Sequence, residues 1–410
     1  MERRGLYPQH YNNKENRVIR REAGFTLIEL LITMVIFILV IAAGSQIFTG
    51  LLTQFKQQSK IAETNIEGIV GLEILRQDIE HAGYGLPWVI PTGVTYSEAS
   101  SPPASTYNDA SNPPRAIVSG NNAALNGSDY LVVKSVNVAP NFTAGKWQPL
   151  RAGTSSSMKT WWVPSRENVC RSDDDAHFPN VRVIVLSPGS TSANSRSLVV
   201  SGGSFFTGAD DYTNLTNFAP AAGDTETRIM YGVDPDTNLR MPFNRADYYI
   251  STANVPQRCA APGTGTGVLV KSVIEHATGN RGAGLPLLDC VADMQVIYRI
   301  DSNNDGTIDF ATDNLATLTD TNGNGIIDAQ EIREQIKEVR VYILAHEGQR
   351  DVNYDATTTY PGNQITIPPT ASDPGFGLGS TFDFVANGIT NWQNYRWKVY
   401  TIVVKPNNLR

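Results

Sequence analysis

Cysteine is scarce in this chain of 410 residues, which has only Cys170, Cys259 and Cys290. Their wide spacing excludes a zinc site built from several thiolates and a CxxC redox motif. If the body of the chain is exported, the simplest count is one disulfide and one free thiol. We expect Cys259 to pair with Cys290, because the segment between them is short and rich in glycine and proline. Three unpaired, buried thiols are the alternative.

An excess of positive charge is also missing. The net charge is −7 at pH 7, and the first 24 residues hold more basic than acidic side chains, so the rest of the chain is more acidic still. Proteins that bind nucleic acid without sequence preference neutralise phosphates with basic side chains. We therefore expect no nucleic-acid partner.

The common catalytic motifs are absent as well. The sequence has no HExxH, no GxSxG, no Walker loop and no GxGxxG after a strand. The five histidines are scattered, and the acid/histidine cluster at 173–177 is better explained as a solvated loop than as a metal site. We expect no catalytic residues and no enzymatic activity.

What the sequence does have is a long apolar run near its amino terminus. Residues 25–43, FTLIELLITMVIFILVIAA, contain one ionisable group, Glu29. As a helix rising about 1.5 Å per residue, this run is close to the ~30 Å hydrocarbon thickness of a bilayer. The basic residues upstream predict a cytoplasmic leader and an extracytoplasmic body. A secretory signal or a plain anchor would fit the length, but neither explains a carboxylate inside a spanning helix.

The residues around Glu29 carry a specific resemblance. Gly24 followed by FTLIE resembles the class III signal of type IV pilins and type II secretion pseudopilins. The resemblance implies that a prepilin peptidase cuts after Gly24 and methylates the new terminus, Phe25. It also implies that Glu29 is an assembly contact, because it would attract the terminal amine of a neighbouring subunit and so compensate its own burial. The leader is long for this family, and a start codon downstream of Met1 would shorten it.

The helical pattern continues beyond the apolar run. Apolar residues recur at three- and four-residue steps as far as Ile79, and no proline occurs before Pro87. We expect one helix from Phe25 to His81. The predicted parts are a leader (1–24), a transmembrane and filament-core half (25–43), an amphipathic half (44–82) and an extracytoplasmic β-rich body (83–410).

The body is predicted to be an antiparallel β-sheet. Short β-branched runs, several of which alternate apolar and polar residues, predict strands at 129–136, 181–186, 197–200, 267–274, 294–300, 339–346 and 397–405. Residues 95–127 and 203–226 are rich in small and polar residues, and we expect long surface loops there. The predicted fold class is α+β, a long N-terminal helix packed on an antiparallel sheet with long loop insertions, as in type IV pilins.

Two further stretches resemble PilW-type minor pilins. They are LRQDIEHAGYGLPW at 75–88 and YRWKVYTIVVKPNNLR at 395–410. The resemblance implies a minor pilin that joins other minor pilins to prime or cap a type IV pilus, and hence a part in adhesion and twitching motility. The implied partners are other minor pilins, the major pilin, the inner-membrane assembly platform and a tip adhesin. The implied location is the inner membrane, as a single-pass protein with a periplasmic body, and the pilus tip after assembly.

Two other functions stay open at this point. A type II secretion minor pseudopilin of the J or K kind would have the same fold, although K-type pseudopilins generally lack an acid at the position of Glu29. A membrane-tethered, calcium-dependent adhesin would retain residues 1–24, whereas a prepilin would lose them.

One segment matches the calcium-loop pattern at every defining place. Residues 320–331, DTNGNGIIDAQE, follow the twelve-residue calcium-loop pattern. Alternate positions offer oxygen ligands, Gly325 permits the sharp turn and Glu331 can bind in bidentate fashion. The predicted calcium ligands are Asp320, Asn322, Asn324, the carbonyl of Ile326, Asp328 and Glu331.

A second segment repeats the front half of that pattern. In residues 301–312, DSNNDGTIDFAT, the closing glutamate is missing, and Asp313 lies one place beyond. The predicted ligands are Asp301, Asn303, Asp305, the carbonyl of Thr307 and Asp309. A strand before this loop, and a short helix and a strand after 320–331, predict a clip between two strands. Turns without metal are the alternative. We expect calcium to stabilise the body rather than to signal, since weak extracellular-type affinity suffices outside the cytoplasm.

Overall fold

The computed structural model describes residues 24–110, 112–152, 181–189, 195–208, 212–367, 378 and 380–409. Cys170 and the acid/histidine cluster at 173–177 lie outside the described residues. The chain divides into two compact units, Met1–Lys56 and Gln57–Arg410. Helix α1, Leu27–Glu80, contributes residues to both units.

Helix α1 confirms the predicted long helix, with ends within two residues of those expected. In the first unit its apolar side chains are exposed along the whole helix, from Leu27 to Phe55. The helix is long and apolar enough to cross a membrane. A helix that exposes apolar side chains on every side requires a cover of lipid or of other helices.

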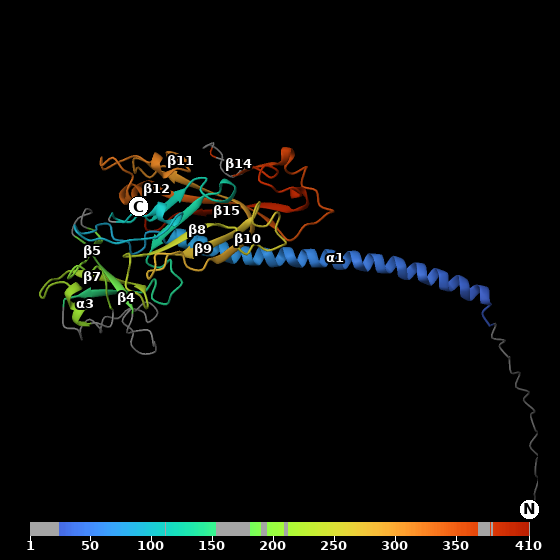
Figure 1. Ribbon diagram of the computed structural model, residues 1–410, viewed down its shortest axis with the longest axis horizontal. Helices are drawn as coiled ribbons and strands as arrows, with labels where there is room; N and C mark the ends of the chain where they lie inside the picture. Colours follow the sequence, from blue (N-terminus) through green and yellow to red (C-terminus); the bar gives the residue numbers. More distant parts are fainter. Residues whose placement is uncertain are drawn as a thin grey trace, which may run out of the picture. The chain divides into compact units, whose positions relative to one another are not determined.

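The second unit is built on an antiparallel sheet of eight strands among the described residues. Seven follow the order β1-β2-β8-β9-β10-β12-β15, and β11 pairs with β10. Figure 1 labels six strands of this sheet, namely β8, β9, β10, β11, β12 and β15. The bounds of the eight strands are β1 Ile117–Gly120, β2 Tyr130–Ser135, β8 Asn244–Ser251, β9 Gly267–Val273, β10 Leu285–Ile300, β11 Phe310–Thr312, β12 Ile336–Glu347 and β15 Arg396–Val404. This sheet confirms the predicted α+β fold.

One face of this sheet packs on the second half of α1. Leu72, Leu75 and Ile79 recur at three- and four-residue steps and are buried against the sheet. Their partners alternate along the strands, so that every second residue points to the helix. They include Leu131, Val133, Tyr248, Leu269, Met294, Val296, Val341 and Ile402.

The opposite face of the sheet carries a second, smaller core. It is covered by a hairpin of β13, Gln364–Ile367, and β14, Ser380–Asp383. The rings of Phe384 and Trp392 are stacked with centroids 5.0 Å apart, and Trp397 of β15 lies 4.7 Å from Phe384. The sheet is therefore buried on both faces at this end.

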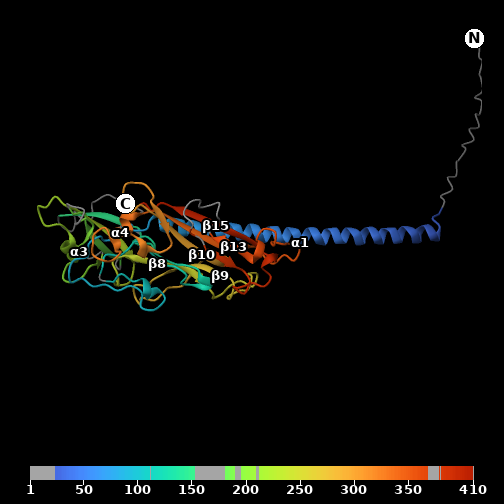
Figure 2. The same cartoon turned by 90° about the horizontal axis from the view of Figure 1, so that it is seen from above.

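A five-stranded antiparallel sheet lies at the other end of the second unit, beside helix α3, Tyr212–Phe218 (Figure 1). Figure 2 shows α3 at the same end in the turned view. The order of this sheet is β3-β7-β4-β5, with β6 beside β4. The bounds are β3 Trp147–Arg151, β4 Arg182–Ser187, β5 Ser197–Leu198, β6 Thr207–Gly208 and β7 Thr227–Asp234.

The segment 95–127 is more ordered than a surface loop, and in this respect the expectation was wrong. It contains the 3-10 turns Ala104–Tyr107 and Leu125–Gly127 and strand β1. Its carboxylate Glu98 is fully buried and lies 2.8 Å from Lys134 of β2 and 2.9 Å from Arg245 of β8. Because buried charges need partners, the segment is held on the sheet by ion pairs that its polar composition did not suggest.

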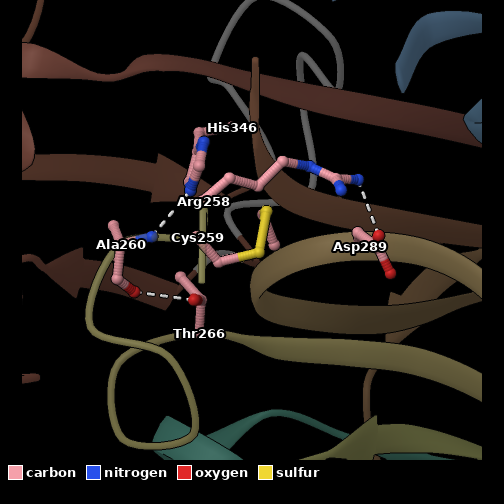
Figure 3. Close-up of a disulfide and its surroundings, with 7 residues drawn as sticks. Arg258, Cys259, Ala260, Thr266, Asp289 and His346 are labelled. Carbon is pink, nitrogen blue, oxygen red and sulfur yellow. Dashed lines mark hydrogen bonds and ion pairs between the residues drawn. A yellow bond between two sulfur atoms is a disulfide. The ribbon is translucent and has the colours of Figure 1, made fainter. Parts of the chain in front are cut away.

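The predicted disulfide between Cys259 and Cys290 is confirmed, with Cα atoms 4.9 Å apart (Figure 3). It joins the loop before β9 to β10. Next to it, Nε2 of His346 accepts a hydrogen bond from the backbone N–H of Ala260 at 2.9 Å. Burial lowers the pKa of His346 to about 3, so this imidazole is neutral and acts as an acceptor.

Candidate functional site

The amino-terminal candidates Gly24, Phe25 and Glu29 lie at the start of α1. Gly24 and Phe25 precede the first helical turn, and Phe25 is 83% exposed. The Glu29 carboxylate accepts hydrogen bonds from the backbone N–H and the hydroxyl of Thr26, both at 2.9 Å. In return, the Thr26 hydroxyl accepts from the N–H of Glu29 at 3.3 Å.

This reciprocal pair is a capping box, which satisfies backbone donors at a helix start. The T-x-x-E spacing of Thr26 and Glu29 is a sequence signature of that arrangement, although the prediction for Glu29 did not include it. Glu29 therefore has a partner within its own chain, in addition to any role in assembly.

In the loop 320–331, the first three predicted side-chain ligands are held by backbone donors. The Asp320 carboxylate accepts from the N–H groups of Gly323 at 2.7 Å and Gly325 at 2.8 Å. The Oδ1 atoms of Asn322 and Asn324 each accept from the N–H two residues later. Gly325 has φ +83°, which a side chain would strain. The loop is thus folded by its own polar groups.

Asp328 lies opposite these amides and also begins helix α4, Ala329–Gln335. Its Oδ2 accepts from Nδ2 of Asn322 at 3.2 Å and of Asn324 at 2.8 Å. Its Oδ1 accepts from the N–H of Gln330. The two amides thus direct N–H groups at Asp328 and keep their Oδ1 atoms on the backbone, so both amides would have to turn before their oxygens could bind a cation.

Glu331, the last predicted ligand, is fully buried. Its Oε2 accepts from the N–H of Asp328 at 3.1 Å, and its Oε1 accepts from the hydroxyl of Thr321 at 3.0 Å. The side chain therefore returns to the start of the loop. Ile326, whose backbone carbonyl is a predicted calcium ligand, lies at the tip of the loop and is 55% exposed.

The loop 301–312 repeats this hydrogen-bond pattern in its front half. The Asp301 carboxylate accepts from the N–H groups of Asp305 at 3.1 Å and Gly306 at 2.8 Å. Asn303 and Asp305 each accept from the N–H two residues later, as their counterparts do. Gly306 has φ +91°. The two loops share one backbone design.

The back half of the loop 301–312 differs. Asp309 accepts from the N–H and hydroxyl of Ser302, and residues 310–312 form β11, so Thr312 at the closing position pairs with Tyr298 of β10. The Lys337 ammonium lies 3.8 Å from Asp301 and donates to Asn304. This loop already has a cation beside its first carboxylate. It fits calcium less well than the loop 320–331.

Helix α4 connects the two loops to each other and to the turn that follows α1. The Gln335 side chain bonds both the N–H and the carbonyl of Thr319, and its backbone carbonyl accepts from the N–H of Asp301. On the other side of α4, the Arg333 guanidinium lies over the ring of Trp88. Because α4 contacts both loops, a conformational change in either loop would also affect this helix.

Comparison with known protein families adds two matches. The prokaryotic N-terminal methylation motif matches residues 19–45, and the family Type IV Pilus-assembly protein W matches residues 247–408. The second match includes both loops, α4, and the strands from β9 to β15. No curated protein and no solved structure matches the chain.

These two matches support a PilW-like minor pilin. The methylation-motif match contains Gly24, Phe25 and Glu29, and the PilW-family match contains all the predicted calcium ligands. The matched families describe pilus assembly and amino-terminal methylation, and neither match names an enzymatic activity. The motif and the long apolar helix fit an anchor in the inner membrane.

One cluster of metal-ligand types in this PilW-like chain has another explanation. Among the described residues, Cys259, Cys290 and His346 form a group whose ligand atoms lie within 4.8 Å of one another. The two sulfurs are joined in the disulfide, and Nε2 of His346 accepts a hydrogen bond from the N–H of Ala260. The group is a covalent crosslink with a packed imidazole.

Proposed function

We propose that this PilW-like chain is a minor pilin that joins other minor pilins to prime or cap a type IV pilus. In this proposal, a prepilin peptidase cuts after Gly24 and methylates Phe25, and Glu29 attracts the terminal amine of a neighbouring subunit. The partners would be other minor pilins, the major pilin, the assembly platform and a tip adhesin. A large, acidic body favours a place at the tip over many copies in a thin shaft.

The observation that carries the proposal is the combination of two features in one chain. The methylation motif lies at the start of a helix with exposed apolar side chains, and the PilW-family match covers the strands from β9 to β15. A plain membrane anchor accounts for the first feature and leaves the second unexplained.

Two experiments test this function. Deletion of the gene should abolish or sharply reduce surface pili and twitching, and normal piliation would contradict the proposal. Mass spectrometry of the purified protein should find a mature chain that starts at methylated Phe25. Retention of residues 1–24 would instead favour a tethered adhesin, and loss of secretion with intact pili would favour a type II pseudopilin.

We also propose that calcium stabilises the body through the loop 320–331. In the proposed site Asp320, Asn322 and Asn324 turn their side-chain oxygens to the ion, and the Ile326 carbonyl, Asp328 and Glu331 complete the ligand set. The support is the oxygen-rich donor set and the return of Glu331 to the loop start. The loop 301–312, through Asp301, Asn303, Asp305, Thr307 and Asp309, would bind more weakly, because Lys337 lies beside it.

Thermal unfolding of the full chain in detergent tests the calcium proposal. Calcium should raise the midpoint relative to chelator, because a ligand that binds only the folded state stabilises it. Magnesium at the same concentration should have a smaller effect, since it requires a tighter octahedral site. Equal midpoints in calcium and in chelator would contradict the proposal.

A further inference from the structure

Lys134 of β2 is fully buried, and its ammonium lies between two carboxylates. The Nζ atom lies 2.6 Å from Oδ2 of Asp109, and 3.0 Å and 2.8 Å from the two carboxylate oxygens of Glu98. Glu98 is fully buried as well, and Asp109 is 9% exposed. The three side chains are thus in direct contact and almost out of reach of bulk water.

The surroundings of Lys134 differ from those of another buried lysine. Two lysines among the described residues are buried, Lys134 and Lys271 of β9. Lys271 donates to the carboxylate of Asp78 in α1, and the hydroxyl of Tyr248 donates to the same oxygen. Lys271 therefore contacts one acid, whereas Lys134 contacts one acid that it can react with and a second that can carry protons.

Glu98 is placed to exchange protons with Lys134. Its Oε2 also accepts from the Arg245 guanidinium at 2.9 Å, and its Oε1 accepts from the backbone N–H of Asp109 at 2.7 Å. These bonds fix the Glu98 carboxylate beside both the amine and the second acid. A carboxylate fixed against a proton donor in this way can act first as a general base and then as a general acid.

The Asp109 carboxyl receives two further hydrogen bonds from Arg115. Nε of Arg115 donates to Oδ1 at 2.7 Å, and the backbone N–H of Arg115 donates to Oδ2 at 3.0 Å. Burial would raise the pKa of Asp109, but Lys134 and Arg115 together lower it, so the carboxyl is ionised in the ion pair and must gain a proton before it reacts. The Arg115 donor on Oδ1 stabilises the negative charge that forms there when a nucleophile adds to Cγ.

We propose that Lys134 and Asp109 condense to an amide, which crosslinks β2 to the segment after the turn Ala104–Tyr107. A bond forms between Nζ and Cγ, and the bond between Cγ and Oδ2 breaks. Two protons of the ammonium leave with Oδ2 as one water molecule, and the third stays on the amide nitrogen. Glu98 carries the two protons from nitrogen to oxygen in turn. The reaction needs no oxidant, reductant or other reactant.

The condensation preserves the charge balance of the cluster. It removes one cation and one anion, and the neighbouring groups Arg115, Arg245, Glu98 and Asp247 stay as two cations and two anions. Charges that are taken out of water lose hydration that a partner only partly replaces, and a neutral group in their place avoids that loss. The buried site therefore favours the amide over the separate ions more than water would.

The crosslink closes a covalent loop over residues 109–134, which includes β1. This strand has four residues and lies at the edge of the eight-stranded sheet, where it pairs with β2. Short segments at an edge are among the first to open locally. The amide limits this opening and restricts the unfolded chain, as a disulfide would. This inference is independent of the role proposed in pilus assembly.

Mass spectrometry of the full chain, purified in detergent and then reduced and denatured, tests the proposal. The chain should be lighter by one water molecule than its processed sequence predicts. Trypsin does not cleave after an acylated lysine, so the peptides 77–115 and 116–146 should be joined, and fragment ions should place the link at Asp109 and Lys134. Separate peptides with cleavage after Lys134, a link to Glu98 in place of Asp109, or a water deficit without a joined peptide would overturn the proposal.

Substitutions separate the chemistry from the packing. Lys134→Arg keeps the buried charge but cannot form the amide, so the water deficit and the joined peptide should both be lost. Lys271→Arg is the matched control and should keep both. Glu98→Gln can accept hydrogen bonds but cannot carry protons, and it should lower the joined fraction by at least about tenfold. The native joined fraction in a folded Glu98→Gln variant would contradict the role of Glu98. If a variant does not fold, the mass and peptides of the native chain still decide.

Discussion

The guanidinium carbon of Arg333 lies 4.1 Å from the centre of the Trp88 indole ring. Arg333 belongs to α4, which begins inside the loop 320–331, and Trp88 belongs to the turn that follows α1. A second cation, Arg196, lies 4.6 Å from the same ring. The contact places one ring between the proposed calcium loop and the carboxyl-terminal end of the long helix.

Trp88 should therefore report on the loop. We expect calcium to change the fluorescence of the full chain, with a component that disappears in Trp88→Phe. Arg333→Ala should remove this component and lower the free energy of unfolding by about 1 kcal/mol, as expected for a partly buried cation–π contact. Arg196→Ala also removes a cation from the ring but leaves α4 intact, so it should keep the calcium response. Equal responses in both variants would contradict this connection.

Glu331→Gln should separate metal binding from helix capping. The glutamine oxygen can still accept from the N–H of Asp328, but the charge for calcium is lost. We expect the calcium-induced rise in thermal midpoint to fall by more than half, while the midpoint in chelator changes little. Glu334→Gln, the same substitution in the same helix, should keep the full rise. A full rise in Glu331→Gln would exclude this residue as a ligand.

Gly71→Ala should weaken the contact between α1 and β10. The new Cβ meets a backbone carbonyl, which cannot rotate away, so we expect a cost of about 2–3 kcal/mol in the free energy of unfolding. Gly50→Ala is the control in the same helix, because no atom lies within 4 Å of its added Cβ. That substitution should be neutral or stabilising by up to about 1 kcal/mol. Denaturant unfolding compares the two, and equal stabilities would contradict the close contact.

Asp293 should make stability fall as pH rises. Burial raises the pKa of this carboxyl from 3.8 to about 7. Between these values the folded chain keeps a proton that the unfolded chain has lost, so the group stabilises folding at low pH and its contribution is lost as pH rises to about 7. Asp293→Asn cannot ionise. Its stability relative to the native chain should rise from pH 4 to pH 7, by on the order of 3–4 kcal/mol, and then level off.

Asp355→Asn is the control for this profile. Asp355 is exposed, and a hydrogen bond from the backbone of Thr357 lowers the pKa of its carboxyl. Its contribution therefore has the opposite sign and is lost as pH falls. This variant should gain no stability at pH 7, and a flat profile for Asp293→Asn would show that Asp293 stays ionised in the folded chain.

Glu29→Gln should distinguish the proposed role of the Glu29 charge in assembly from the role of its side chain in capping α1. Glutamine can still accept from Thr26, so the start of α1 is kept while the proposed attraction to a neighbouring amine is lost. We expect processing to continue and entry into pili to fall sharply, as measured by the amount of the protein in sheared pili. Thr26→Val keeps the charge and weakens the cap, and it should assemble better than Glu29→Gln. Normal assembly of Glu29→Gln would leave capping as the role of this acid.

The sequence predicted those elements whose residues follow a simple periodicity. Helix α1 and strands β2, β9, β12 and β15 all consist of regularly spaced apolar residues, and they were found within a few residues of their observed ends. The disulfide was predicted from the composition of the segment between its cysteines. These features depend on local sequence alone.

Strand β8 was missed for a physical reason. It contains Arg245 and Asp247, which pair with each other at 2.7 Å and are fully buried. Charges in a strand usually indicate an exposed face, and their burial depends on Glu98, which is far away in the sequence. The ordered segment 95–127 was missed for the same reason, because its partners are the cations of β2 and β8.

In the candidate site, the ligand types and the glycines could be predicted, since each has a fixed place in the calcium-loop pattern. The difference between the two loops could not. It depends on Lys337, whose ammonium approaches Asp301 from a different part of the chain. The close contact between α1 and β10 depends on Gly71 and Leu287. These two residues are far apart in the sequence, and no periodicity indicates their contact.

The capping box at the start of α1 has one more consequence. The peptide bond between Gly24 and Phe25 lies before the first helical turn, and the hydrogen bonds that begin the helix come from Thr26 and Glu29. A peptidase that removes the leader would therefore break none of them. The severed helix would keep its amino-terminal end intact, so the proposed cleavage would leave the helix unchanged.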